Sequence, residues 1–479
     1  MGLGFMRDAA VLGVASPGGM YVALDLDENP ITGTTSPRVS EAVCRILGIA
    51  PEGTDAQEWR WDTVDAVARA EGESLLSLPD GKKQFEAFVC YLTGFIHEVR
   101  HFHDILSCCL GQDLLFQTLN LYQNAPPILA ILAHELQARA MMRFPIPIQG
   151  RRDFAKILLD GSSHKEEIQK FFQKCKAVQN RVNANWDLGK PTLSGASLGT
   201  LFELSAVCAQ LGFAMEVFGT MGADTVFRVL SRKRESRRYL EGLRLVQELY
   251  SSNLRKETPE LNAVGYVTWN ALQGRKPCGG KFDGAPSPIV LWECFLEKLA
   301  RNGAVAGDWQ SLNNEIDNIA VSWGLLPLAT SVEDWHAVLD KRIENLASKG
   351  GAEDGHPAVS VGLPAFRGCL SVMKNLFASI IEEPKGYHDL KVYGWSVLTG
   401  VYPAPNVVLK HCGSIGFAQF RGKPVVSASV AGTILLWEGI FDLLMHGRGT
   451  GTISFVEDYV FDALQKGSYG GPALDFWLN

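Results

Sequence analysis

The fold is organised around residues 85–101, FEAFVCYLTGFIHEVRH. The first part of this stretch is apolar and contains no proline, which is typical of a buried helix. His97 and His101 lie four residues apart, so both project from one face of that helix, about one turn from each other. Two imidazoles at this spacing can bind one small metal ion, and Glu98 would lie beside the ion, where a water molecule or an organic ligand binds. The sequence therefore predicts a metal site inside the protein.

The remaining pattern predicts a mainly α fold, a multi-helix body with minor β elements near the N-terminus and in the C-terminal part. Residues 20–26 alternate like a strand, 40–47 form a short helix that Gly48 ends, and 414–420 with 424–427 are expected to form a hairpin. Further helical patterns occupy residues 198–218, 223–253, 289–302, 310–323, 331–348 and 366–382.

Three parts are expected along the chain. Residues 1–80 form a mixed N-terminal segment, 81–273 a helical domain that carries the metal site, and 286–479 a mainly helical C-terminal domain. The segment from Gly274 to Pro288 is rich in glycine and proline and is the expected linker between the two larger parts.

The overall charge of the chain indicates no class of partner. The formal net charge is −7 and the pI is about 5.9 over 479 residues, which excludes a general attraction to nucleic acid or to an anionic membrane. The 223–253 helix is rich in arginine, but no aromatic residues interleave to stack on bases, so we expect a solvated face there. No nucleic-acid partner is predicted.

Ten cysteines are scattered without a CxxC pair, several of them in apolar helical patterns, which favours buried reduced thiols. The N-terminal residues do not have the pattern of a secretory signal, and no uninterrupted apolar run reaches the length of about 18 residues that spans a membrane. We therefore expect a soluble, cytoplasmic protein without a membrane partner.

A zinc or iron site normally needs a third protein ligand, and two glutamates are candidates. Glu135 and Glu203 each lie on an apolar helix with an alanine one turn later, which permits another helix to approach closely. Glu135 is favoured by its separation of 34 residues from His101, and Glu203 by the absence of any other charge between Thr200 and Ala214. The two remain open, and the one that is not a ligand would pair with arginine or face solvent. His134 is a weaker candidate.

Asp104 falls three residues after His101 and seven after His97, on the same helix face. A carboxylate there could accept the outer N–H of a ligating imidazole or bind the ion itself.

The segment resembles the active-site helix of zincin metallopeptidases, and with a downstream glutamate it is similar to the gluzincin subgroup. The resemblance implies that His97, His101 and either Glu135 or Glu203 bind Zn²⁺, that Glu98 is the general base, and that the substrate is a peptide or protein. A tyrosine or histidine would stabilise the oxyanion, with Tyr122, His134 and His411 as candidates. Arg100 and His103 add polar groups that the subgroup pattern does not account for.

Three alternatives use the same residues. Two histidines and one carboxylate also form the facial triad of non-haem Fe²⁺ oxygenases, which would act on a peptide or a small molecule. Glu98 with His101 is half of a di-iron pattern, with Glu135 and Glu203 as bridging candidates, and this alternative needs a second ExxH pair on another helix. A helical interaction protein with a structural metal, or with none, is the non-catalytic alternative.

Overall fold

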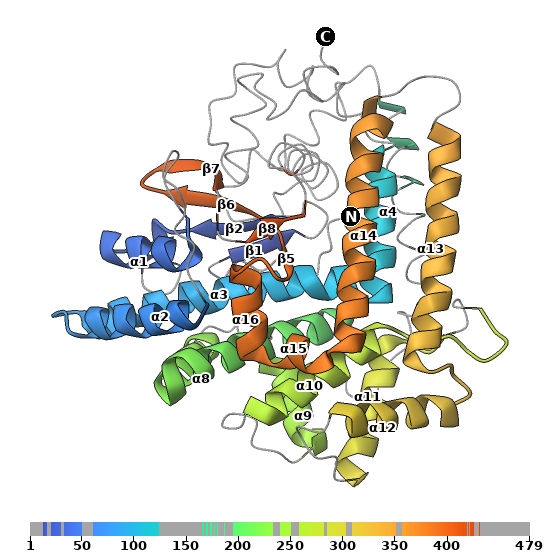
Figure 1. Cartoon of the computed structure of the whole chain (residues 1–479), viewed down its shortest axis with the longest axis horizontal. Helices are drawn as coiled ribbons and strands as arrows, with labels where there is room; N and C mark the ends of the chain where they lie inside the picture. Colours follow the sequence, from blue (N-terminus) through green and yellow to red (C-terminus); the bar gives the residue numbers. More distant parts are fainter. Residues whose placement is uncertain are drawn as a thin grey trace.

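The computed structural model describes residues 13–16, 21–29, 33–49, 61–123, single positions between 165 and 186, 195–232, 240–250, 258–281, 285–302, 309–350, 357–418, 420, 422–425 and 431. The fold is mainly α, as predicted, with small strands near the N-terminus and in the C-terminal part (Figure 1). Its helices are α1 (Pro37–Leu47), α2 (Trp61–Leu76), α3 (Gly81–Ser107), α4 (Cys109–Gln123), α8 (Leu198–Arg232), α9 (Glu241–Tyr250), α10 (Thr258–Leu272), α11 (Pro288–Asn302), α12 (Trp309–Ser322), α13 (Leu328–Gly350), α14 (Pro357–Glu382), α15 (Pro384–His388) and α16 (Leu390–Leu398).

The strands form three small sheets. They are β1 (Gly13–Ser16), β2 (Tyr21–Asp25), β3 (Glu28–Asn29), β4 (Gly33–Thr34), β5 (Pro403–Ala404), β6 (Asn406–His411), β7 (Ser414–Ala418) and β8 (Lys423–Pro424). The largest sheet has the order β1-β2-β6-β7, and the other two are the pairs β3-β4 and β5-β8. In the four-stranded sheet, β2 and β6 run parallel at the centre, while β1 and β7 pair antiparallel at the edges.

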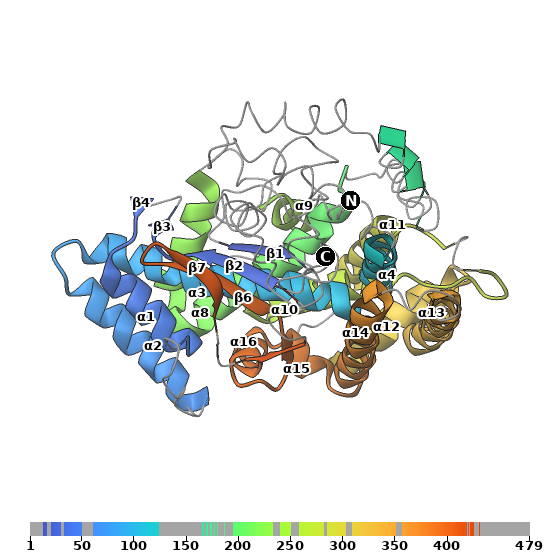
Figure 2. The ribbon, with the colours of Figure 1, turned by 90° about the horizontal axis from the view of Figure 1, so that it is seen from above.

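Helix α3 lies at the centre of the protein. Every residue from Phe85 to Ser107 is buried, which explains why the stretch is apolar on all sides of the helix. Helix α8 packs along α3, and α1, α2, α14 and strand β1 cover it elsewhere. Figures 1 and 2 show the four-stranded sheet and α8 on different sides of α3. Any chemistry on α3 therefore takes place inside the protein.

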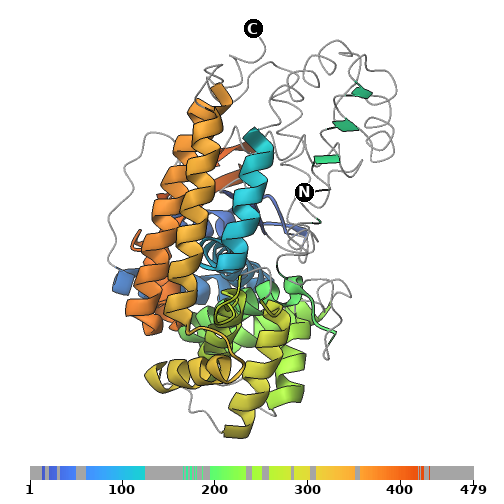
Figure 3. The same ribbon diagram turned by 90° about the vertical axis from the view of Figure 1, so that its right-hand side faces the viewer.

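Two groups of helices complete the body. Helices α4, α13 and α14 contact one another and lie side by side in Figure 3. Helix α10 packs on α8 and α11, and α9 contacts both α8 and α11. The boundaries of α11, α12 and α13 agree with the predicted helical patterns to within three residues, and α14 begins nine residues before its predicted start.

The N-terminal and C-terminal parts share one sheet and one core. Strand β2 pairs with β6 from Tyr21↔Asn406 to Asp25↔Lys410. The buried apolar residues from Tyr21 to Leu409 form one cluster. The parts expected on either side of residue 80 and of residue 286 therefore contribute to one common sheet and one common core.

Two local expectations are corrected by the structure. Residues 414–418 do pair in a hairpin, but with β6, and Pro424 belongs to β8, which pairs with β5, while residues 426 and 427 lie outside the described residues. Pro424 has no N–H to donate to a β ladder, so a strand over 424–427 is a poor partner. The first residues of the expected linker pack against the protein instead of forming an exposed connection. Arg275 is fully buried, and Pro277 forms a β-bridge with Leu325.

The described residues contain one helical span, Leu198–Ser231, that is long and apolar enough to cross a membrane. Its most apolar window has a mean hydropathy of 1.5, but 83% of that window is buried inside the protein. The helix is also interrupted at Gly219, whose φ is 66° and ψ −161°. A core helix passes the same test, so this is weak evidence for a membrane span.

The described cysteines are all free thiols. Five are buried (Cys90, Cys108, Cys109, Cys208, Cys294), Cys44 is half-buried, and Cys278 and Cys412 are exposed.

Candidate metal centre

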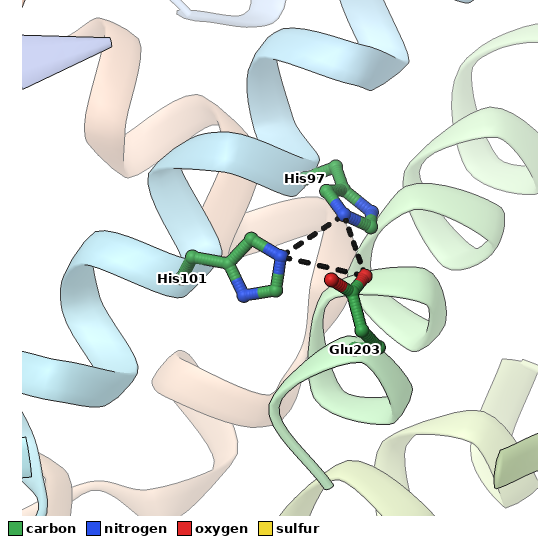
Figure 4. Close-up of side chains that lie close together, drawn as sticks. All are labelled: His97, His101 and Glu203. Atoms are coloured by element: carbon green, nitrogen blue, oxygen red, sulfur yellow. Dashed lines mark hydrogen bonds and ion pairs between the residues drawn. The ribbon is translucent and has the colours of Figure 1, made fainter. Parts of the chain in front are cut away.

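Two helices bring three metal-ligating side chains together. His97 and His101 come from one face of α3, and Glu203 comes from the facing side of α8 (Figure 4). The two Nε2 atoms are 3.1 Å apart. Glu203 Oε2 lies 3.3 Å from His97 Nε2 and 3.6 Å from His101 Nε2. Glu203 is therefore close to both histidines, whereas its rival Glu135 lies outside the described residues.

The three residues lie in the interface between α3 and α8, which we call the seam. Residues four apart lie on one helix face, which places Thr93, His97 and His101 in one row on α3. On α8 the apolar residues around Glu203 pack this face against α3, and the residue at 203 is the charged group that the packing buries. His97, His101 and Glu203 are 2%, 1% and 8% exposed. A single row of polar groups is thus enclosed between two apolar helices.

The separations fit one bound metal ion. Ligand atoms at about 2.0–2.1 Å from a tetrahedral Zn²⁺ are about 3.3–3.4 Å from one another. The three observed separations of 3.1, 3.3 and 3.6 Å lie around this value. Octahedral geometry at similar bond lengths would require about 2.8–3.1 Å. The donor set of two imidazoles and one carboxylate is one that zinc accepts at a catalytic site.

The electrostatics of the site keep Glu203 ionised. Burial by itself would raise the pKa of this carboxyl group, but His101 and His97 outweigh burial and lower it to about 2. Without a metal ion, these contacts are alternative hydrogen bonds, because an imidazole Nε2 that accepts from the other ring carries no proton to donate to Glu203. A buried carboxylate beside two imidazoles is in the charge state that binds a cation.

Asp104 does not support the ligating histidines as the sequence suggested. Its Oδ1 accepts hydrogen bonds from Arg100 Nε at 3.0 Å and from the Tyr387 hydroxyl at 2.7 Å. Among the residues that the structure describes, His101 Nδ1 is buried without a hydrogen-bond partner. Asp104 lies one turn after His101 on the helix, but its carboxylate pairs with the charged guanidinium of Arg100, four residues earlier, which needs an opposite charge because it is buried.

Arg100 lies in a buried polar network beside the site. Its Nε also donates to Ser205 Oγ at 3.2 Å, and Nη1 donates to the Tyr387 carbonyl at 3.0 Å. The guanidinium stands 4.0 Å over the Tyr387 ring and 5.0 Å over the Tyr393 ring. Arg100 is fully buried, so each of these contacts replaces water that it has lost.

Two neighbouring histidines are held neutral. Burial lowers the pKa of His388 well below its usual value, and nearby Arg100 lowers it further. Burial lowers the pKa of His103 to about 3, although its hydrogen bond to the Pro403 carbonyl opposes the shift. The polar groups that did not fit the zincin pattern, Arg100 and His103, therefore tie α3 to the segment 387–403.

The other predicted site residues are placed as follows. Glu98 directly follows His97 on α3 and is buried, at 4% exposed. His411 ends β6, where its Nε2 is 3.6 Å from Cys412 Sγ. Glu135 and His134 lie outside the described residues, as does the side chain of Tyr122 on α4.

Sequence reasoning missed a second polar pair in the seam. Gln210 Nε2 on α8 donates to Thr93 Oγ1 on α3 at 3.3 Å. The signal that could have found it is the spacing, since Thr93 precedes His97 by four residues and Gln210 follows Glu203 by seven.

No protein-family model, no curated protein and no solved structure matches this chain.

Proposed function

We propose that the chain is a zinc-dependent hydrolase that cleaves a peptide bond at the His97–His101–Glu203 centre. The observation that supports this most is the set of ligand-atom separations, 3.1, 3.3 and 3.6 Å, formed by two helices that are far apart in sequence. The HExxH order adds Glu98 next to a ligand, which is the arrangement that the zincin resemblance requires.

Each residue has a defined task in this proposal. His97, His101 and Glu203 hold the ion and leave a fourth position for water or substrate. When bound, zinc would supply a Lewis acid that polarises a carbonyl group and makes a water molecule more acidic. Glu98 accepts the proton of that water and returns it to the leaving amine. The enclosing apolar helices exclude bulk water, which strengthens the electrostatic interactions inside the site.

Metal content tests the first half of the proposal. We expect elemental analysis of protein purified without added metal to find zinc at one ion per chain. Glu203→Gln and His97→Ala should each remove it, because two remaining ligands hold zinc poorly. Glu135→Gln is the matched control and should keep the metal. Loss of the metal from the Glu135 variant but not from the Glu203 variant would reverse the ligand assignment.

Glu98→Gln tests the second half. This variant should keep its zinc but lose about 10²–10⁴-fold in the rate of cleaving a fluorogenic peptide library, since a positioned general base contributes on that order. Unchanged cleavage with zinc still bound would show that Glu98 has no catalytic role.

An Fe²⁺-dependent oxygenase is the second candidate, and the burial of the centre is the observation that favours it. Ligands that are 1–8% exposed suit a small cosubstrate such as dioxygen more readily than a long peptide. The separation of 3.1 Å between the imidazoles also suits octahedral coordination, whereas the two distances to Glu203 are longer. Stoichiometric iron instead of zinc in the elemental analysis would select this candidate.

A further inference from the structure

The seam between α3 and α8 contains a polar pair besides the metal ligands. Thr93 is fully buried and Gln210 is 5% exposed, and they join the two helices through a hydrogen bond of 3.3 Å. The same pair of helices is joined by His97 and Glu203 at 3.3 Å. Both contacts join α3 to α8, so the Thr93–Gln210 pair and the His97–Glu203 pair lie next to each other in the seam.

Helix geometry gives their spacing. An α-helix rises 1.5 Å per residue, so Thr93 lies about 6 Å along α3 from His97, and Gln210 about 10 Å along α8 from Glu203. Ala206 lies between Glu203 and Gln210 on the same face of α8 and contributes only a methyl group there. About 2 Å of this separation is the bond from the ion to a ligand oxygen and about 3 Å is a hydrogen bond to the Gln210 amide, which leaves room for about one peptide unit of a ligand between them.

One end of the Gln210 amide has no partner. Gln210 Oε1 is buried and makes no hydrogen bond within the described part of the chain. Turning the amide over exchanges its oxygen and nitrogen, and one of them still lacks a partner. A buried polar atom without a partner destabilises a fold, so its presence beside a metal centre indicates a group that arrives with a ligand.

We infer that Gln210, held in place by Thr93, binds an amide group of the substrate one peptide unit from the bond that is cleaved. A side-chain amide offers both a donor and an acceptor, which is the complement of a peptide group. The ligand class is thus a short peptide or another small molecule with a secondary amide near its metal-binding carbonyl. This inference rests on the proposed metal-dependent function of the same site.

Two hydroxamates separate metal binding from amide binding. Acetohydroxamate can bind only the metal ion, whereas N-acetylglycine hydroxamate carries one additional amide at the required distance. The protein is loaded with Co²⁺, whose visible absorption bands report both metal binding and ligand binding. We expect the amide-bearing compound to bind the wild-type protein about three- to tenfold more tightly, the range for one net hydrogen bond.

Gln210→Met tests the residue directly, because methionine has a similar length and no amide. This variant should bind Co²⁺ and acetohydroxamate like the wild type and should lose the preference for the amide-bearing compound. Ser205→Ala is the matched control, since Ser205 is a buried polar residue of the same helix whose hydroxyl oxygen accepts a hydrogen bond from Arg100. The control should keep the preference.

The outcomes distinguish the role of Gln210 from the presence of the metal centre. Equal affinities of the wild-type protein for the two hydroxamates, with Co²⁺ bound, overturn the role of Gln210 and leave the metal centre standing. A preference that persists in Gln210→Met overturns it as well. Failure of the wild-type protein to bind Co²⁺, or of the Co²⁺ protein to bind either hydroxamate, overturns the proposed function together with this inference.

Discussion

Arg100 shows how a single charged residue can occupy the core of this protein. A fully buried guanidinium loses its hydration, which costs several kcal/mol unless hydrogen bonds and an opposite charge offset it. Here Asp104, Ser205 and the Tyr387 carbonyl supply those partners. The Arg100–Asp104 ion pair therefore adds little to the net free energy of folding, but removing one partner strongly destabilises the protein.

Asp104→Ala should lower the free energy of unfolding by about 3–5 kcal/mol, since it leaves the Arg100 charge buried without its carboxylate. Urea denaturation measures the change. The control is Arg244→Ala, which removes an exposed ion pair to Glu248 and should cost less than about 1 kcal/mol. Equal effects of the two substitutions would contradict the buried-charge argument.

The Asp104 variant also tests the original expectation for this residue. A carboxylate that supports a metal-bound histidine typically contributes 10–100-fold to metal affinity. Because Asp104 hydrogen-bonds to Arg100 and Tyr387 instead, we expect Asp104→Ala to change zinc affinity, measured by competition with a chelator, by much less than about tenfold.

His388 predicts a pH dependence of stability. Its pKa in the folded protein is well below the value of about 6.5 expected in the unfolded chain. Below pH 6.5 the unfolded state therefore binds a proton that the folded state does not, and stability falls as the pH falls, by up to about 1.4 kcal/mol per pH unit. Urea midpoints of the wild-type protein and His388→Gln, measured from pH 7.5 to pH 5, should show a smaller slope for the variant. Identical slopes would exclude His388 as the source.

At the scale of elements, α8 and α16 approach each other through glycines. Gly394 of α16 faces Phe213 of α8, and a Cβ at Gly394 would lie 2.5 Å from Phe213 Cδ2. Gly212 of α8 faces Leu390 of α16 in the same way. The position of α16 against the helix that carries Glu203 thus depends on the absence of two side chains.

Gly394→Ala should reduce the free energy of unfolding by about 1–3 kcal/mol, the usual cost of an extra group in a tightly packed core. Gly368→Ala on α14 is the matched control, because a Cβ there has nothing within 4 Å. The control should stabilise the protein by about 0.5–1 kcal/mol, since alanine is the better helix former. Thermal unfolding of both variants tests the difference, and a stabilised Gly394→Ala variant would contradict the contact.

Sequence patterns predicted most of these elements well, for an identifiable reason. Burial on one side or on all sides leaves a periodic apolar pattern, and α3, α11, α12 and α13 show it. The β6–β7 hairpin was missed because its turn, Cys412-Gly413, is not a common turn pair. Both residues have positive φ, 50° and 76°, and Asp27 accepts hydrogen bonds from both of their N–H groups.

The candidate site was predictable only in part. The spacing of His97 and His101 determines which face they share, because both lie on one helix. The spacing says nothing about which other helix faces them, so Glu135 and Glu203 remained equal candidates. The packing of α8 on α3 brings Glu203 to the histidines, contact with Tyr387 gives Asp104 a partner, and such packing depends on contacts between residues distant in sequence.

At the scale of the whole molecule, the shared sheet and core predict that the central region does not fold alone. A fragment of residues 81–273 lacks strand β1 and helix α14, which cover α3 in the full chain. Without them the apolar residues of α3 would face water, so we expect no cooperative urea transition of the fragment by circular dichroism. The full chain should show one transition that coincides by circular dichroism and tryptophan fluorescence. A cooperative transition of the fragment would establish an independent domain.

The pairing of β2 with β6 has a consequence for how the protein is made. Asp25 and Lys410 face each other across this pair, 385 residues apart in the chain. At about 5–20 residues per second, a ribosome needs roughly 20–80 seconds to supply the partner of a strand that has already emerged. During that time the apolar edge of β2 is exposed to other nascent chains. The protein should therefore depend on chaperones during synthesis more than its helical content suggests.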